Sequence, residues 1–125
     1  MTENEISYLI RGAIFKIHTR FGPGLFENVY KQILKHELEK LGLKVKAEVP
    51  LPLIYDNTRF DIGYRIDLLV NDLVIVELKS VDTLTEAHHK QTITYLKLSG
   101  LKLALLVNFN SHNIVKNIFR KVNRL

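Results

Sequence analysis

Cysteine is absent from this 125-residue chain, and no apolar run approaches the ~20 residues that a membrane-spanning helix needs. Without cysteine there is no disulfide framework, no thiolate zinc site and no cysteine nucleophile. Any catalysis must therefore use carboxylates, lysine, histidine, hydroxyl groups or a hard metal ion. The first five residues are acidic where a signal peptide would be basic, so we expect a cytoplasmic protein that does not associate with membranes.

Acidic residues are missing from the last third of the chain. Glu86 is the last of the 13 acidic residues, and the charged residues that follow it are all lysines and arginines. Such a basic flank suits a polyanion, because Lys and Arg neutralise phosphates without reading sequence. We predict a rim that holds nucleic-acid phosphates; an ordinary solvated surface is the alternative. The rim residues are Lys90, Lys97, Arg120, Lys121 and Arg124.

The overall composition is that of a folded globular protein. Hydrophobic residues make up 46% of the chain and charged residues 25%, which excludes wholesale disorder and a fibrous repeat. The length suffices for one hydrophobic core and is short for two. We therefore expect a single domain over residues 1–125.

The pattern of apolar residues predicts helix, helix, three strands, helix, strand and a short tail. Helical spacing covers about 2–19, 24–41 and 84–98, and strand patterns cover 44–53, 59–70, 73–79 and 101–109. Pro50 and Pro52 indicate that the first strand lies at an edge of the sheet. Residues 114–125 favour a short amphipathic helix, with a strand as the alternative. This order predicts an α/β fold with a mixed sheet flanked by helices.

Two of the predicted strands place an aspartate opposite a glutamate. When the apolar faces of 59–70 and 73–79 are paired as a hairpin, Val70 lies opposite Val74. The same register places Asp67 directly opposite Glu77. It also requires a three-residue loop or a nearby bulge, because a two-residue turn would shift every pair.

Opposed carboxylates repel each other and lose hydration when covered, so a cation has to lie between them. Lys79 follows two residues after Glu77 on the same strand face and would neutralise the pair in part. A divalent ion such as Mg²⁺ or Mn²⁺ would do so more fully, because hard cations prefer carboxylate oxygens. A salt-bridged, solvent-facing strand pair is the alternative.

Three further polar residues lie on helix faces that are otherwise mostly apolar and point inward. Glu27 opens the apolar stripe of the second helix and lies in its first turn, where the helix dipole favours an anion. It is either an ordinary N-terminal acid or an outer ligand of a shared site. Gln91 and Tyr95 lie four residues apart on one face of the later helix, and a buried hydrogen-bonded pair without function is equally compatible with them.

These residues, in this order, resemble the PD-(D/E)xK nuclease superfamily. Asp67 followed by Glu77-Leu78-Lys79 is similar to its core motif, and Glu27 with Gln91-x-x-x-Tyr95 is similar to its recombination-nuclease and junction-resolvase branch. The segment 24–30, Gly-Leu-Phe-Glu-Asn-Val-Tyr, resembles the signature of the GxxExxY proteins. Ile66 stands where the name of the motif has a proline, a position that is commonly lost in the superfamily.

The resemblance implies a single restriction-endonuclease-like αβββαβ core with an extra N-terminal helix, and metal-dependent phosphodiester hydrolysis. It implies that Asp67, Glu77 and the backbone carbonyl of Leu78 bind Mg²⁺ or Mn²⁺, while Glu27 holds a metal-bound water or a second ion. Lys79 would orient the attacking water and stabilise the phosphorane charge. It further implies that two residues position the site or the nucleic-acid backbone, namely Gln91 and Tyr95.

Two functions from different classes therefore remain. The first is a Mg²⁺-dependent nuclease acting on nucleic acid, with DNA favoured as the substrate. The second is a non-catalytic nucleic-acid-binding or protein-interaction module on the same fold. A small-molecule hydrolase is disfavoured, because there is no nucleophile elbow and no Ser-His-Asp pattern. The chain has no added module that reads nucleic acid, so a nuclease would need a homodimer, a partner in a larger complex or a structural substrate.

Overall fold

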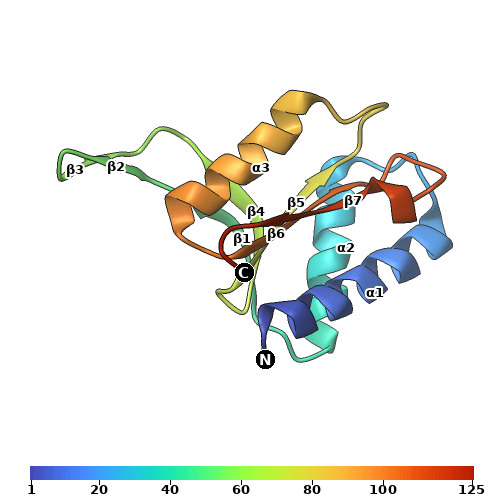
Figure 1. The fold of residues 1–125 in the computed structure, drawn as a ribbon. Helices are drawn as coiled ribbons and strands as arrows, with labels where there is room; N and C mark the ends of the chain where they lie inside the picture. The colour runs from blue at the N-terminus through green and yellow to red at the C-terminus, as the bar shows by residue number, and fades with distance from the viewer.

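The computed structural model describes residues 1–125 and contains a five-stranded sheet with helices on both faces (Figure 1). The order of the strands is β1-β4-β5-β6-β7, and β2 and β3 form a separate hairpin that projects from the sheet. The strands are β1 (Val45–Pro50), β2 (Leu53–Tyr55), β3 (Thr58–Phe60), β4 (Arg65–Val70), β5 (Val74–Lys79), β6 (Leu103–Asn108) and β7 (Ile118–Val122). The helices are α1 (Glu3–Phe21), α2 (Glu27–Lys40) and α3 (Glu86–Ser99), and a short 3₁₀ helix covers Val115–Asn117.

The sheet is mixed, which confirms the predicted α/β class. Strand β5 pairs in parallel with β6, and α3 forms the crossover between them. All the other pairs are antiparallel. Strand β6 is buried at every residue, as its continuous apolar run predicts, and β1 lies at an edge of the sheet, as its prolines predict.

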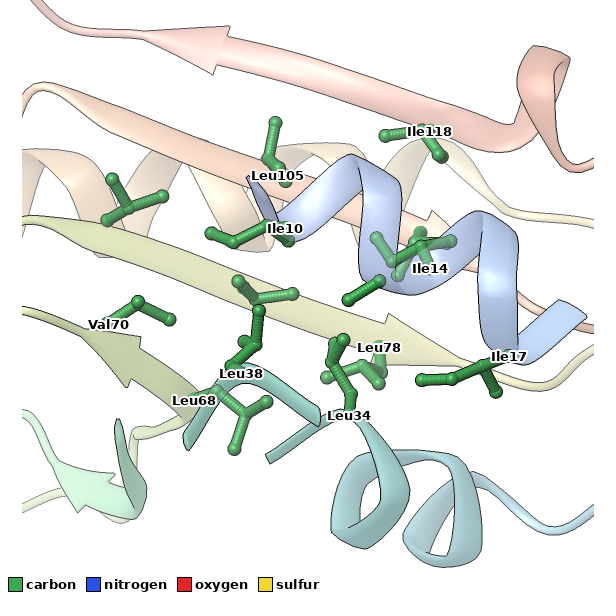
Figure 2. Close-up of a cluster of buried hydrophobic side chains, with 14 of the residues drawn as sticks. Ile10, Ile14, Ile17, Leu34, Leu38, Leu68, Val70, Leu78, Leu105 and Ile118 are labelled. Atoms are coloured by element: carbon green, nitrogen blue, oxygen red, sulfur yellow. The ribbon is translucent and has the colours of Figure 1, made fainter. Parts of the chain in front are cut away.

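Helices α1 and α2 cover one face of the sheet. Figure 2 shows Ile10 and Ile14 of α1 and Leu34 and Leu38 of α2 packed against Leu68 and other side chains of the sheet. Helix α1 begins with a capping box, for which Thr2 and Glu5 have the required spacing in the sequence: the Thr2 hydroxyl accepts from the Glu5 N–H, and the Glu5 carboxylate accepts from the Thr2 N–H. A smaller cluster on the other face packs under α3, and it consists of Ile66, Ile75, Tyr95, Leu96 and Ala104.

The register of the β4–β5 hairpin agrees with the prediction from the alternating apolar residues. Val70 pairs with Val74 and Leu68 pairs with Val76. Three residues, Asn71 to Leu73, form the loop, as this register requires. Asn71 and Asp72 adopt φ values of 51° and 55°, a left-handed conformation that Asn and Asp tolerate better than other side chains.

Two predicted strands are each divided in the structure. The first ends at Pro50 and resumes as β2 at Leu53, and the second begins as β3 and resumes as β4 at Arg65. The prolines of the Pro50-Leu51-Pro52 segment lack the N–H groups that would continue the ladder. The pairing therefore stops there, and the projecting β2–β3 hairpin begins beyond it.

The C-terminal segment is a strand, so the prediction that favoured a helix is wrong. Residues Ile118–Val122 form β7 and pair antiparallel with β6. A helix of this length is marginal because nucleation costs more than a few hydrogen bonds return. The edge of β6 instead offers a backbone partner for every second residue, and the β-branched Ile118 and Val122 favour the extended conformation.

Helix α2 begins at Glu27, three residues after the predicted start. A side chain of α2 stabilises the turn before the helix: the Tyr30 hydroxyl donates to the Gly22 carbonyl and accepts from the Leu25 N–H. The Tyr30 ring stacks on Phe109 with 4.4 Å between the ring centroids. None of the helices combines the length and the hydropathy that crossing a membrane requires.

Candidate active site

The β4–β5 hairpin changes its bonding at Asp67 and Glu77. Backbone pairing runs from the loop to Leu68 and Val76, and one step further the two acids lie opposite each other. There, side chains replace the ladder. The Asp67 N–H donates to Glu77 Oε2 at 2.8 Å, and the Leu78 N–H donates to Asp67 Oδ2 at 2.9 Å. Each carboxylate thus bonds to the backbone of the opposite strand, and together they hold β4 and β5 side by side at this level.

The pairing of β4 with its other neighbour, β1, is interrupted at the same level. The register pairs residues on both sides of Glu48 and Asp67 but skips these two, and Glu48 has a φ of 54°. Ala47 packs against the cluster under α1 and α2, whereas Val49 packs against the cluster under α3. Residues two apart in a regular strand share a face. The β1–β4 ribbon therefore twists at Glu48 and Asp67, and Ile66 turns toward α3 in the same way.

Lys31 is a residue of this site that the sequence interpretation missed. It lies on α2, only 8% of it is exposed, and its ammonium group binds Glu48 and lies 3.9 Å from Asp67 Oδ1. Burial by itself would lower its pKa. The hydrogen bond to Glu48 and the charges of Asp67, Glu48 and Glu27 outweigh burial and raise the pKa of Lys31, so the group is charged.

The two opposed carboxyls are hard to ionise together. Burial, and then the charge of Asp67, raise the pKa of Glu77 to about 8. Burial likewise raises the pKa of Asp67, although the Leu78 N–H and the charges of Lys31 and Lys79 act against it. A cation bound between the two carboxyls would favour their ionised forms and lower both pKa values.

Glu27 and Lys79 lie close enough to act on this pair through their charges. The charge of Glu27 raises the pKa values of both Asp67 and Glu77, whereas the charge of Lys79 lowers them. Neither side chain makes a hydrogen bond or an ion pair with the two acids. The strand end that carries Lys79 is tied to the turn before α2, because the Ser80 hydroxyl donates to the Leu25 carbonyl at 2.7 Å.

Tyr95 lies beside the site on α3, one turn after Gln91. Tyr95 is buried and packs edge-to-face on Tyr64 at 5.7 Å between ring centroids. Burial raises its pKa, and the charge of Glu77 raises it further, so the phenol and the carboxylate are neighbours. Gln91 is half-buried and makes no hydrogen bond with either acid.

The sequence as a whole was compared with known proteins. A family model described as the PD-(D/E)XK nuclease superfamily matches residues 4–122, which is nearly the whole chain. The protein belongs to the PD-(D/E)XK nuclease superfamily. No curated protein and no solved structure matches it significantly. The mixed sheet with helices on both faces agrees with the restriction-endonuclease-like fold expected of this superfamily.

Nucleases of the PD-(D/E)XK superfamily generally depend on a divalent metal ion, and two oxygens of this site are free to bind one. Asp67 Oδ1 and Glu77 Oε1 form no hydrogen bond within the protein. No fully buried side-chain oxygen or nitrogen lacks a partner, so Glu77 Oε1 reaches solvent although only 2% of the residue is exposed. Two carboxylate oxygens without a hydrogen bond, on acids that lie opposite each other, suit Mg²⁺ or Mn²⁺.

The acids of the site do not form a larger cluster around that position. No three His, Asp or Glu side chains lie where they could hold a metal ion together, so Glu27 does not complete a set with Asp67 and Glu77. Lys31 lies beside Asp67 instead. The fit is therefore that of two carboxylates, with Glu27 acting at longer range through its charge.

The five basic residues predicted to form one rim do not lie on one surface. Arg120 extends toward α1, where its Nη2 donates to Asn4 Oδ1 at 2.7 Å, and Lys90 is exposed and ion-paired with Glu86. Lys121 lies over the Phe119 ring on the α3 side of the sheet. The pKa of His89 on α3 is lowered mainly by burial and also by the positive charge of Lys121. The remaining two line one pocket of about 490 Å³, whose walls are Lys97, Gly100, Lys102, Asn123 and Arg124.

The sequence interpretation missed two residues of the site, Lys31 and Glu48. The helical spacing of α2 contains a signal for Lys31. Lys31 follows Glu27 by four positions, which places the two side chains on one face of α2. Glu48 has no such signal. It lies in an alternating strand pattern, and its positive φ arises only where β1 and β4 twist together.

Proposed function

We propose that the protein is a metal-dependent nuclease that hydrolyses phosphodiester bonds in nucleic acid, with DNA as its first candidate substrate. The observation that carries the proposal is the opposed pair of buried carboxylates, Asp67 and Glu77, in a chain of the PD-(D/E)XK nuclease superfamily. The pair is partly compensated by lysines and retains one unbonded oxygen on each side.

Each residue has a role that follows from its charge and position. Asp67, Glu77 and the backbone carbonyl of Leu78 hold Mg²⁺ or Mn²⁺, and Glu27 orients water at the opening of the site. A divalent cation bound there supplies positive charge that acidifies water and polarises a phosphoryl oxygen. Lys79 orients the attacking water and stabilises the charge that develops on the phosphate. Tyr95 and Gln91 position the carboxylates or the nucleic-acid backbone from α3.

Lysine and arginine side chains on the α3 side of the sheet supply phosphate contacts away from the cleaved bond. The pocket of Lys97, Lys102 and Arg124 contains three cations, no carboxylate side chain and no hydrophobic residue. None of the three forms an ion pair within the chain. Phosphodiester oxygens are suitable partners for such a surface, because Lys and Arg bind them by charge without regard to sequence.

The decisive experiment measures cleavage and metal binding in the same variants. Labelled duplex, branched and single-stranded DNA, and RNA, are incubated with Mg²⁺ or Mn²⁺ and with wild type, Lys79→Ala, Asp67→Ala or Lys35→Ala. Lys79→Ala should abolish cleavage while metal still binds, because Lys79 acts on the transition state. Asp67→Ala should lose both. Lys35→Ala, one turn beyond Lys31 on α2 and ion-paired with Glu39, should match wild type.

Two results would contradict the proposal in different ways. Absence of wild-type cleavage on every substrate, together with metal binding that requires Asp67, would favour the non-catalytic module. Cleavage that survives Lys79→Ala would show that a different group performs the chemistry.

The phosphate contacts are tested by the salt dependence of DNA binding. Neutralising Lys97, Lys102 and Arg124 together should flatten the slope of log affinity against log salt by about 0.9 per lost duplex phosphate contact. The control neutralises Lys16, Lys35 and Lys40, three cations that are ion-paired with Glu37 or Glu39. Equal slopes for the two variants would contradict a role for the pocket.

A further inference from the structure

Lys31 is the one cation in ion-pair distance of the opposed acids. It lies one helical turn after Glu27, it is nearly fully buried, and its ammonium group lies between Glu48 of β1 and Asp67 of β4. A buried lysine is costly unless its charge is paired. Here Glu48 provides a hydrogen bond and Asp67 provides a second, more distant charge, so the ammonium group is held between the two strands.

The position of the ammonium group matters because of how Asp67 uses its two oxygens. Oδ2 accepts the Leu78 N–H at 2.9 Å, and this bond joins β4 to β5. Oδ1 is left, and it is the oxygen that lies 3.9 Å from Lys31 Nζ. A metal ion that binds Asp67 through its unbonded oxygen therefore approaches the same atom as the ammonium group.

We infer that Lys31 is the resident counter-ion of Asp67, which a divalent metal has to displace, and that Lys31 thereby sets the metal affinity of the site. The inference rests on the proposed function, because it takes Asp67 to be a metal ligand. Lys31 is a positioning residue in this scheme. Its ammonium group stays beside Asp67 Oδ1 while no metal is bound, and it opposes the entry of a second cation.

Glu48 can hold the ammonium group of Lys31 after a metal ion has displaced it from Asp67. Its left-handed backbone conformation, at the twist of the β1–β4 ribbon, directs its carboxylate to Lys31. With a metal on Asp67, Lys31 keeps its hydrogen bond to Glu48 and withdraws from Oδ1. Charge repulsion between the metal and an ammonium group this close is large even at the effective dielectric of a protein surface.

The test is isothermal titration of Mn²⁺, and separately Mg²⁺, into metal-free protein without nucleic acid. Lys31→Gln removes the charge and should bind Mn²⁺ at least tenfold more tightly than wild type. Lys31→Arg keeps a cation between Glu48 and Asp67 and should stay within about threefold of wild type. Lys35→Gln removes a charge one turn further along α2, at an exposed pair with Glu39, and should leave the affinity unchanged. Circular dichroism checks that each variant is folded.

A second measurement keeps the test valid if Lys31→Gln is unstable without metal. Its thermal midpoint should rise more steeply with Mn²⁺ concentration than that of wild type, because metal replaces the missing counter-ion. Equal Mn²⁺ affinity in wild type and Lys31→Gln, or weaker binding in Lys31→Gln, would overturn the inference and leave the metal site intact. Absence of Mn²⁺ binding in wild type, Lys31→Gln and Lys31→Arg alike would overturn the metal-dependent function itself.

Discussion

The two ends of the β4–β5 hairpin are built from the same strands but differ in what holds them together. At the loop end, Val70 pairs with Val74 and Leu68 with Val76 through the backbone, and all four side chains are fully buried among other apolar groups. At the far end, carboxylates of Asp67 and Glu77 bond to backbone N–H groups of the opposite strand. One end is a hydrophobic core, and the other is a charged site inside the same sheet.

This difference shows how a small protein keeps a reactive site within a stable sheet. The apolar end sets the register, and the register then forces two acids into positions that they would not occupy by themselves. Their mutual repulsion and lost hydration oppose folding. The loop end, the helices and Lys31 have to supply the compensating stability. The expected effects of substitution therefore differ in sign between the two ends.

Leu68→Ala should have the largest effect and should destabilise the protein. Leu68 is fully buried at the loop end, and truncating such a leucine removes about 2–5 kcal/mol through lost burial and the cavity left behind. Urea unfolding measures the change. Leu41→Ala, at a leucine that is 53% exposed, is the control and should change stability by about 0.5 kcal/mol or less. A loss at Leu68 no larger than at Leu41 would contradict the distinction between the two ends.

Glu77→Gln should stabilise the metal-free protein at pH 8 and have little effect at pH 4. The pKa of Glu77 is raised to about 8 by burial and by the charge of Asp67, so the unfolded chain releases this proton first. Stability should therefore fall as the pH rises from about 4.5 to 8, and the amide should remove that part of the slope. Linkage from this shift gives a gain on the order of 4 kcal/mol at pH 8.

The measurement is urea unfolding in EDTA over this pH range, with the exposed Glu39→Gln as the control. Only the difference between wild type and variant isolates Glu77, because the raised pKa of Asp67 adds a slope of the same sign and the lowered pKa of His89 adds one of the opposite sign. A constant difference between pH 4 and 8 would mean that Glu77 is not held in a raised-pKa state. Saturating Mn²⁺ should reverse the order of stability of wild type and variant.

Tyr30→Phe should have the smallest effect on stability of these three substitutions. Tyr30 contacts both the hydrophobic core and the turn that leads to the site. The hydroxyl bonds to Gly22 and Leu25 in the turn before Glu27, while the ring stacks on Phe109 in the core. Phenylalanine keeps the stacking and loses the bonds, so we expect a loss of about 1–2 kcal/mol. Hydrogen exchange should quicken at the Leu25 amide. Unchanged exchange at Leu25 would show that the turn is held by other contacts.

Particular residues show how far the sequence could predict the fold and the site. The alternation of β4 and β5 was sufficient to place Asp67 opposite Glu77, because a shift of one residue would have moved every apolar side chain to the wrong face. The capping box at Thr2, the edge position of β1 and the buried β6 also followed from local patterns. The C-terminal segment did not, since its apolar spacing fits a helix as well as a strand.

The sequence by itself determined the features whose residue patterns fit only one structure, namely the two amphipathic helices that open the chain and the register of β4 and β5. It also determined that no acidic residue balances the lysines and arginines after Glu86. Tertiary structure decided the rest. Residues 118–122 became a strand because β6 offered an unpaired edge. Lys31 came to lie beside Asp67 because the β1–β4 ribbon twists at Glu48, and a twist depends on how neighbouring strands and helices pack, which no local pattern encodes.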